Sequence, residues 1–101
     1  MSDRQFQFEW DEEKAAANIR KHRVSFEVAS SVFADPRLLS VADLEHGEAE
    51  ERWFSVGRAV NGAMLSVVYV WQEIDQALTK IRLISARPAT RHEIRFYEEN
   101  L

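Results

Sequence analysis

The sequence has 101 residues, a length that fits one domain built around a single hydrophobic core. Hydrophobic residues make up 46% of it and charged residues 30%, a composition that excludes disordered and fibrous proteins. It contains no cysteine, which excludes disulfides, thiolate metal sites and cysteine nucleophiles. Because it also shows no apolar run typical of a signal peptide or a membrane span, we expect a cytoplasmic protein folded as one domain over residues 1–101.

The net charge is −4, but positive and negative side chains are segregated along the chain. Residues 79–95 hold five Lys and Arg side chains and a single acid, whereas residues 43–51 hold five acids and no Lys or Arg. An acidic total argues against a nucleic-acid footprint that covers the whole protein. The local excess of cations is still compatible with a confined anion-binding surface.

The N-terminal part predicts one strand and then two helices. Apolar side chains alternate over residues 6–10, which indicates a short strand. Asp11 is a good cap for a helix that runs to about His22, and Ser25 is a good cap for a second helix. The second helix should end at the Asp-Pro pair of residues 35–36.

The rest of the chain changes from helical to alternating periodicity. Four strands are predicted, and Asn61-Gly62 between the second and third of them is a strong hairpin signal. Thr90 and Glu93 form a capping-box pattern that predicts a final helix. The resulting order, β-α-α-β-β-β-β-α, indicates an α+β domain of two layers, a mainly antiparallel sheet with helices packed on one face. The four strands are expected at residues 37–43, 52–58, 63–71 and 79–85.

Cationic side chains gather around the junction between the last strand and the last helix. Arginine binds phosphate well because its planar guanidinium donates two parallel hydrogen bonds and stays charged. Strand alternation places Lys80 and Arg82 on one face with Arg58 nearby, and Arg87 and Arg91 could converge on the same ligand near a helix N-terminus. The alternative is a solvated surface in which these arginines pair with the protein's own acids: Glu93, Glu98, Glu99 or the acidic segment 43–51.

A second candidate is the end of the first helix, where Lys21 and His22 lie next to each other. A titratable histidine beside cations suits general acid–base chemistry on a phosphodiester, although such a histidine can equally be a helix-capping residue. The sequence shows no paired carboxylates, no His-X-His spacing and no Gly-rich phosphate loop. An enzyme acting on RNA would therefore be expected to work without a metal or other cofactor, with the RNA 2′-OH as nucleophile.

Three blocks of the sequence, taken together, resemble the BrnT family of type II toxins. They are FEWDEEKAAANIRKHRVSFEVASSVFADP, EERWFSVGR and IRLISARPATRHEIRFYEE, and the resemblance extends over residues 6–99. The sequence departs from the family pattern at Arg23, where glycine is usual, and at Pro88, where lysine is common. A glycine would end the first helix in a left-handed conformation, so Arg23 must adopt that conformation with strain or end the helix differently.

The resemblance implies a RelE-like fold and a ribonuclease, with or without the ribosome, that arrests growth and is neutralised by a BrnA-type ribbon-helix-helix antitoxin, which also binds operator DNA. On this reading the acidic segment 43–51 does not touch RNA. An alternative is a toxin-like module of reduced activity that binds its antitoxin and contributes to transcriptional autoregulation. The expected catalytic residues are His22 as general base or acid and Arg82, Arg87 and Arg91 around the scissile phosphate, and the expected substrate-binding residues are Lys21, Arg58, Lys80 and Arg95.

Overall fold

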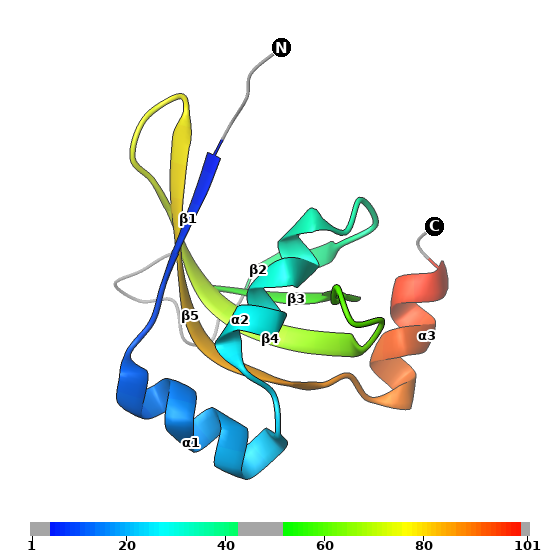
Figure 1. Ribbon diagram of the computed structural model, residues 1–101. Helices are drawn as coiled ribbons and strands as arrows, with labels where there is room; N and C mark the ends of the chain where they lie inside the picture. The colour runs from blue at the N-terminus through cyan, green and yellow to red at the C-terminus, as the bar shows by residue number, and fades with distance from the viewer. Residues whose placement is uncertain (1–4, 43–51, 100–101) are drawn as a thin grey trace.

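The computed structural model describes residues 5–42 and 52–99 (Figure 1). The element order is the predicted one, with a 3₁₀ helix, η1, added after the second helix. The acidic segment 43–51 lies outside the described residues. The elements are β1 (Gln5–Glu9), α1 (Glu12–His22), α2 (Phe26–Ser30), η1 (Ser31–Ala34), β2 (Leu39–Ala42), β3 (Arg52–Arg58), β4 (Met64–Glu73), β5 (Leu78–Pro88) and α3 (Arg91–Glu99).

The strands form one sheet in the order β1-β5-β4-β3-β2. The first strand pairs in parallel with the last, and the other neighbours are antiparallel. The mainly antiparallel α+β fold is therefore confirmed. Strand β5 lies between β1 and β4, so residues of β1 and β5 that are far apart in sequence become neighbours.

Helices α1 and α2 pack on one face of the sheet, here called the covered face (Figure 1). Phe26 of α2, Val32 of η1 and Val67, Tyr69 and Ile81 of the sheet are almost completely buried there. The hydroxyl groups of Tyr69 and Ser55 are 2.6 Å apart, close enough for a hydrogen bond inside this core. Because removing this apolar area from water contributes about 25 cal/mol per Å², the covered face supplies most of the driving force for folding.

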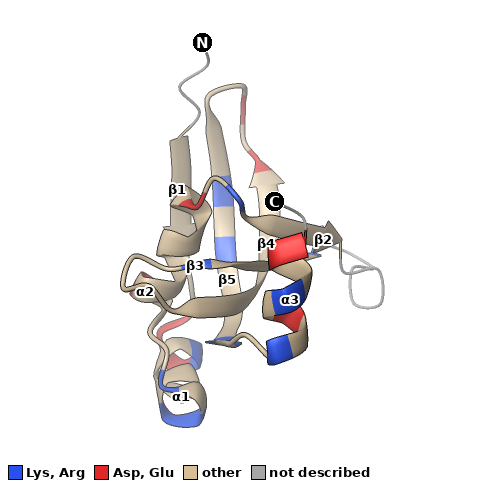
Figure 2. Cartoon of the chain, turned by 90° about the vertical axis from the view of Figure 1, so that its right-hand side faces the viewer, with Lys and Arg blue, Asp and Glu red and all other residues tan. Residues whose placement is uncertain are grey.

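Helix α3 lies on the opposite face, here called the open face, at the end where β5 leaves the sheet (Figure 2). Phe96 and Glu93 line a pocket with Phe54 and Val56 of β3, and Ser66 of β4 donates a hydrogen bond to Glu93. The expectation that the helices pack on one face thus holds for α1 and α2 but not for α3. The difference arises from tertiary contacts of Glu93 that the sequence pattern does not reveal.

A β-bulge in β5 decides which side chains reach the open face. Tyr69 of β4 pairs with Leu83 and its neighbour Val68 pairs with Ser85, so Ile84 is an extra residue without a direct partner. Arg82 and Arg87 are five positions apart and would point to opposite faces of a regular strand. The extra residue reverses the alternation and brings both arginines to the open face.

Asn18 of α1 fixes the helix layer to β5 just beyond the bulge. Its side-chain amide donates to the carbonyls of Ala86 and Val24, at 2.7 and 2.9 Å, and its Oδ1 accepts from the N–H of Ala86 at 3.1 Å. Asn18 is only 6% exposed. An amide buried in this way is tolerable because its hydrogen-bonding groups find partners, and those partners make its position specific.

Helix α1 ends at Arg23, which adopts the left-handed conformation with φ of 59° and ψ of 33°. The N–H of Arg23 donates to the carbonyl of Ile19, as expected for this type of helix end. Of the two possibilities that the sequence left, the strained one is realised. Arg23 therefore ends the helix in a conformation that carries a steric penalty for a residue with a Cβ atom.

Candidate functional site

A small polar pocket of about 210 Å³ opens on the open face where β1, β5 and β4 lie side by side. It is lined by Glu9, Val70, Gln72, Lys80 and Arg82. The sheet register explains why these residues meet, because Arg82 is the direct partner of both Glu9 and Val70, and Lys80 is the partner of Gln72. The pocket combines one carboxylate, one ammonium group and one guanidinium group.

The carboxylate and the ammonium group of this pocket form a loose ion pair. Glu9 Oε2 lies 3.7 Å from Lys80 Nζ, and the two side chains are 46% and 31% exposed. Charge-assisted hydrogen bonds of this kind usually measure about 2.7–2.9 Å. Both groups are therefore accessible to a ligand without the loss of a strong internal contact.

Arg52 extends the cationic surface beside this pocket. It is the direct partner of Val70, so Arg52, Val70 and Arg82 form one row across β3, β4 and β5 on the open face. The backbones of the two arginines are two strand spacings apart, roughly 10 Å, which long guanidinium side chains can bridge around one phosphate. Within the described part of the chain, the Nε of Arg52 is buried and has no hydrogen-bond partner. Strand alternation in RWFSVGR could have indicated Arg52, which is not among the site residues predicted from the sequence.

A second cationic group on the same face, Arg87, is held by a carboxylate. Its two terminal nitrogens donate to the two oxygens of Glu93, at 2.9 and 2.8 Å. Glu93 Oε1 also accepts from the hydroxyl of Ser66 at 2.7 Å and from the N–H of Thr90 at 2.9 Å. The predicted capping box is thus formed, since Thr90 Oγ1 in turn accepts from the N–H of Glu93.

These contacts determine the protonation of the Arg87–Glu93 pair. The hydrogen bonds from Arg87 outweigh the effect of burial and lower the pKa of Glu93 to about 2. The same hydrogen bonds raise the pKa of Arg87. Both groups therefore stay charged at neutral pH, and the guanidinium is directed toward Glu93.

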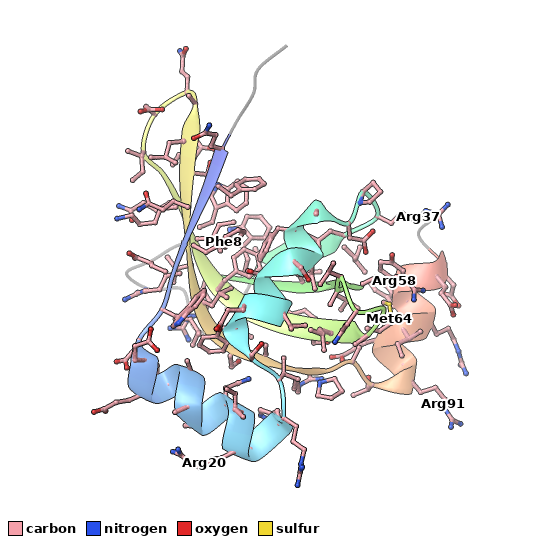
Figure 3. The ribbon with its side chains drawn as sticks, in the orientation of Figure 1. Phe8, Arg20, Arg37, Arg58, Met64 and Arg91 are labelled. Carbon is pink, nitrogen blue, oxygen red and sulfur yellow. The ribbon has the colours of Figure 1, made fainter. Side chains whose placement is uncertain are left out.

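The structure does not bring all the predicted phosphate-binding arginines together. Arg82 and Arg87 share a face, but five residues of strand separate them by roughly 15 Å. Arg91 and Arg95 are exposed on α3, and Arg91 points away from the sheet (Figure 3). Lys80 and Arg82 do line one pocket, as strand alternation predicted.

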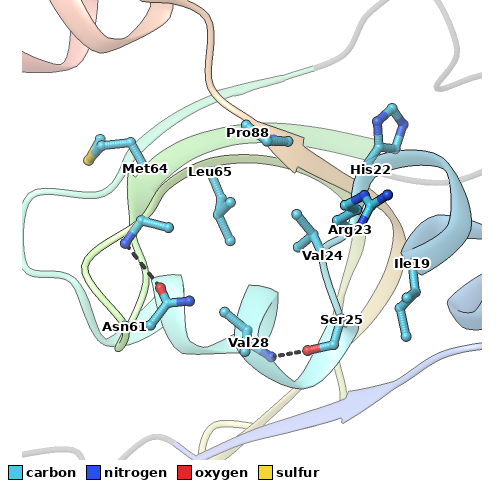
Figure 4. A pocket seen from close by; sticks show the side chains of 11 residues that line it. Ile19, His22, Arg23, Val24, Ser25, Val28, Asn61, Met64, Leu65 and Pro88 are labelled. Atoms are coloured by element: carbon cyan, nitrogen blue, oxygen red, sulfur yellow. Dashed lines mark hydrogen bonds between the residues drawn. The ribbon is translucent and has the colours of Figure 1, made fainter.

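His22 lines a different and larger pocket of about 580 Å³, between the end of α1, the start of α2 and the β3–β4 turn (Figure 4). Val28 and Leu65, which line the same pocket, belong to the layer that packs on the covered face. The sheet therefore separates His22 from the pocket of Arg82. Lys21, its neighbour, is exposed on α1.

Arg58 belongs to a polar junction at the end of β3 (Figure 3). Its N–H and the hydroxyl of Tyr97 each donate to Asp35 Oδ2 at 2.8 Å, and its guanidinium donates to the carbonyl of Gly62. Burial raises the pKa of Asp35, but the hydrogen bonds from Arg58, Arg37 and Tyr97 outweigh this effect and leave it below its usual value. The buried Tyr97 thus ties α3 to Asp35, the residue after η1.

Two further features are negative findings. Within residues 5–42 and 52–99, no three side chains of the types that bind metal ions lie close enough together to share one. None of the helices in that part of the chain is long and apolar enough to cross a membrane.

Comparison of structures identifies the class of the fold. A crystal structure of a ribonuclease toxin, BrnT, from Brucella abortus superimposes with a TM-score of 0.60 at 19% sequence identity, covering 86% of this chain and 100% of that chain. The two chains therefore share the same fold. No curated protein sequence matches the chain.

Sequence comparison identifies the family. The family described as "Ribonuclease toxin, BrnT, of type II toxin-antitoxin system" matches residues 10–93. The chain belongs to this BrnT family, and membership of a type II system implies an antitoxin partner. The resemblance noted in the sequence is thereby confirmed.

Proposed function

We propose that this chain is an endoribonuclease that cleaves RNA without a metal ion, by attack of the 2′-OH on the adjacent phosphate, at the open-face pocket. The observation that carries the proposal is the meeting of Glu9, Lys80 and Arg82 in one accessible polar pocket of a chain that belongs to a ribonuclease toxin family. The protein itself thus supplies the acid–base and cationic groups that this reaction needs.

In this proposal Arg82 holds the scissile phosphate, together with Arg52 from the other side of Val70. Negative charge grows on the phosphate oxygens as the 2′-oxygen adds, and guanidinium groups oriented beforehand stabilise that charge more than they stabilise the bound substrate. Lys80 adds a third positive charge at the pocket. The products are a 2′,3′-cyclic phosphate and a 5′-OH.

The other residues selected from the sequence receive different roles. Arg87 maintains the strand-to-helix junction through Glu93, and Arg58 maintains the junction at Asp35. Arg91 and Arg95, exposed on α3, would contact the RNA backbone outside the pocket. Lys21 and His22 lie across the sheet from the pocket and have no role in this reaction scheme.

We further propose that the antitoxin partner is a BrnA-type ribbon-helix-helix protein and that unopposed toxin arrests growth. An acidic or apolar segment of the antitoxin would cover part of the open face, because it complements the cations of Lys80 and Arg82. Co-expression with the neighbouring gene product and size-exclusion chromatography test this pairing. Separate elution of the two proteins would contradict it.

The enzymatic proposal is tested by incubating the purified chain with single-stranded RNA in excess EDTA, with and without ribosomes. We expect cleavage that yields 2′,3′-cyclic phosphate ends, and no cleavage of DNA of the same sequence. Activity that chelator abolishes and magnesium restores would reject the mechanism. A chain that binds its antitoxin but cleaves neither substrate would instead be the module of reduced activity.

A further inference from the structure

We infer that the carboxylate of Glu9 is the general base that removes the proton from the attacking 2′-OH. The inference rests on the proposed function and adds to it the group that activates the nucleophile. Glu9 is the carboxylate of a pocket whose other charged groups are Lys80 and Arg82, both on the neighbouring strand β5.

The backbone on both sides of Glu9 is anchored, which fixes the direction of its side chain. Phe8 packs against Phe33 with ring centroids 5.5 Å apart, and Trp10 packs against Phe26 at 5.8 Å. Both aromatic rings belong to the covered face, so strand alternation directs Glu9 to the open face. A base that must reach one hydroxyl benefits from such fixed placement.

The contacts of Glu9 differ from those of a structural carboxylate in the same sheet. Glu93 accepts hydrogen bonds from Arg87, Ser66 and Thr90 and is therefore saturated. Glu9 is 46% exposed, and its ion pair with Lys80 is 3.7 Å long. An accessible carboxylate with a loose partner can accept a proton from a substrate hydroxyl, whereas a saturated one cannot.

A phosphate bound by Arg82 would lie within reach of Glu9. Arg82 is the direct neighbour of Glu9 across the β1–β5 pairing, about one strand spacing or roughly 4.8 Å away between backbones. A phosphate bound by Arg82 brings the ribose of the preceding nucleotide toward Glu9. The positive charges of Lys80 and Arg82 also offset the repulsion between the Glu9 carboxylate and the phosphate.

The reaction step balances with groups that the pocket holds. The proton of the 2′-OH passes to a Glu9 oxygen while the 2′-oxygen forms a bond to phosphorus. The bond from phosphorus to the 5′-oxygen breaks, and that oxygen takes a proton from the Lys80 ammonium group. Transfer of the proton from Glu9 back to Lys80, 3.7 Å away, restores the starting state.

The test compares Glu9→Gln, Glu9→Asp and a matched control, Glu73→Gln. Glu73 is exposed and pairs with Thr79, a buried residue of the covered face, so the control removes one negative charge outside the pocket. We expect Glu9→Gln to lower kcat on single-stranded RNA by on the order of 100-fold or more, as loss of a general base does. KM should be unchanged or lower, because the variant loses a negative charge near the phosphate, and Glu9→Asp should restore part of kcat. The dependence of kcat on pH should lose its acidic limb in Glu9→Gln and keep it in Glu73→Gln.

The outcomes separate this inference from the proposed function. If wild-type protein cleaves RNA but not DNA and Glu9→Gln retains the wild-type kcat and pH profile, Glu9 is only an ion-pair partner of Lys80 and the inference is overturned. If wild-type protein cleaves DNA equally well, or cleaves nothing with or without ribosomes, the proposed function fails and the role of Glu9 fails with it. Thermal midpoints within a few degrees of wild type would show that a lower kcat does not result from loss of folding. If Glu9→Gln does not fold, the kcat of Glu9→Asp is measured instead. A wild-type kcat in Glu9→Asp would then overturn the inference.

Discussion

Strand β5 carries two arginines on the same face of the sheet, each near a glutamate, and the contacts of the two glutamates differ. Arg87 and Glu93 form a two-pronged ion pair at 2.9 and 2.8 Å, which Ser66 and Thr90 complete. Arg82 is the strand neighbour of Glu9, which forms an ion pair with Lys80 at 3.7 Å in an accessible pocket. The two arginines share residue type and face, but the contacts of the nearby carboxylates differ, since Glu93 holds Arg87 tightly and Glu9 forms a loose ion pair with Lys80. We propose that this difference separates a phosphate-binding arginine from a structural one.

The largest effect that this comparison predicts is on catalysis at the open-face pocket. Arg82→Ala should reduce RNA cleavage by roughly 30- to 1000-fold, because one lost charge-assisted contact in the transition state costs on the order of 2–4 kcal/mol. Arg82→Lys should recover part of it, since an ammonium group cannot reproduce the planar guanidinium. Rates measured beside thermal midpoints check this, with Arg20→Ala, an exposed arginine of α1, as control. Full activity in Arg82→Ala would remove the distinction between the two arginines.

The next effect is on stability at the junction. Glu93→Ala should lower the free energy of unfolding by on the order of 3 kcal/mol, because it leaves Arg87, Ser66 and the Thr90 N–H without their acceptor. The midpoint should fall by roughly 15 °C for a domain of this size, while kcat below the transition stays near wild type. Chemical denaturation gives the free energy, and Glu98→Gln, an exposed residue of the same helix, is the control. An undiminished stability would mean that the junction is a solvated surface.

Acid should weaken the same junction. The pKa of Glu93 is about 2 in the folded protein and near its ordinary value of 4.5 when unfolded, so the folded state favours the charged form. The stabilisation is complete above pH 4.5 and is lost as pH falls from 4.5 toward 2. It should amount to about 2 kcal/mol after allowance for solvent around the partly exposed Arg87.

Denaturation curves of wild type and Glu93→Gln at several pH values measure this loss. Asp35, whose pKa is also lowered, contributes to acid sensitivity in both proteins, so the difference between them isolates Glu93. Parallel pH profiles for the two proteins would contradict the prediction.

The smallest effect concerns neither glutamate and shows that stability and activity are separable. Arg23→Gly should raise the free energy of unfolding by up to about 1 kcal/mol, because glycine adopts the left-handed conformation at the end of α1 without steric cost. Arg23→Ala keeps that cost and should not stabilise the protein. Cleavage by Arg23→Gly should equal that of wild type, and a destabilised glycine variant would show that the Arg23 side chain makes a contribution larger than its strain.

The sequence predicts those parts of the fold that depend on neighbouring residues. The bounds of α1 and β3 agree with the prediction because a helix cap and a strand alternation are local signals. β5 was predicted to end at residue 85 but continues to Pro88, because its pairing with β4 extends that far. The same pairing sets the position of its bulge. A bulge of this kind changes the face of every later residue, which single-strand alternation cannot reveal.

The candidate site was likewise predictable only where it depends on residues of a single strand. Lys80 and Arg82 follow from alternation within one strand, and both line the pocket. Glu9 was missed because it reaches them only through the parallel pairing of the first and last strands. Arg87 was predicted to bind the phosphate. Whether its guanidinium contacts a ligand or Glu93 depends on how α3 packs against the sheet, which local sequence does not reveal.

The parallel pairing of β1 with β5 also has a consequence for synthesis. The position between β1 and β4 remains empty until β5 has left the ribosome, and the hydrogen bonds of Asn18 cannot form before Ala86, which follows 68 residues later, has been made. Contacts of such long sequence separation slow folding, because loop-closure entropy is lost before they form. The open-face pocket, which needs Glu9 and Arg82 together, cannot exist on a nascent chain. On the proposed function, activity would therefore arise only after β5 has been made, and an antitoxin already present could bind the toxin as it folds.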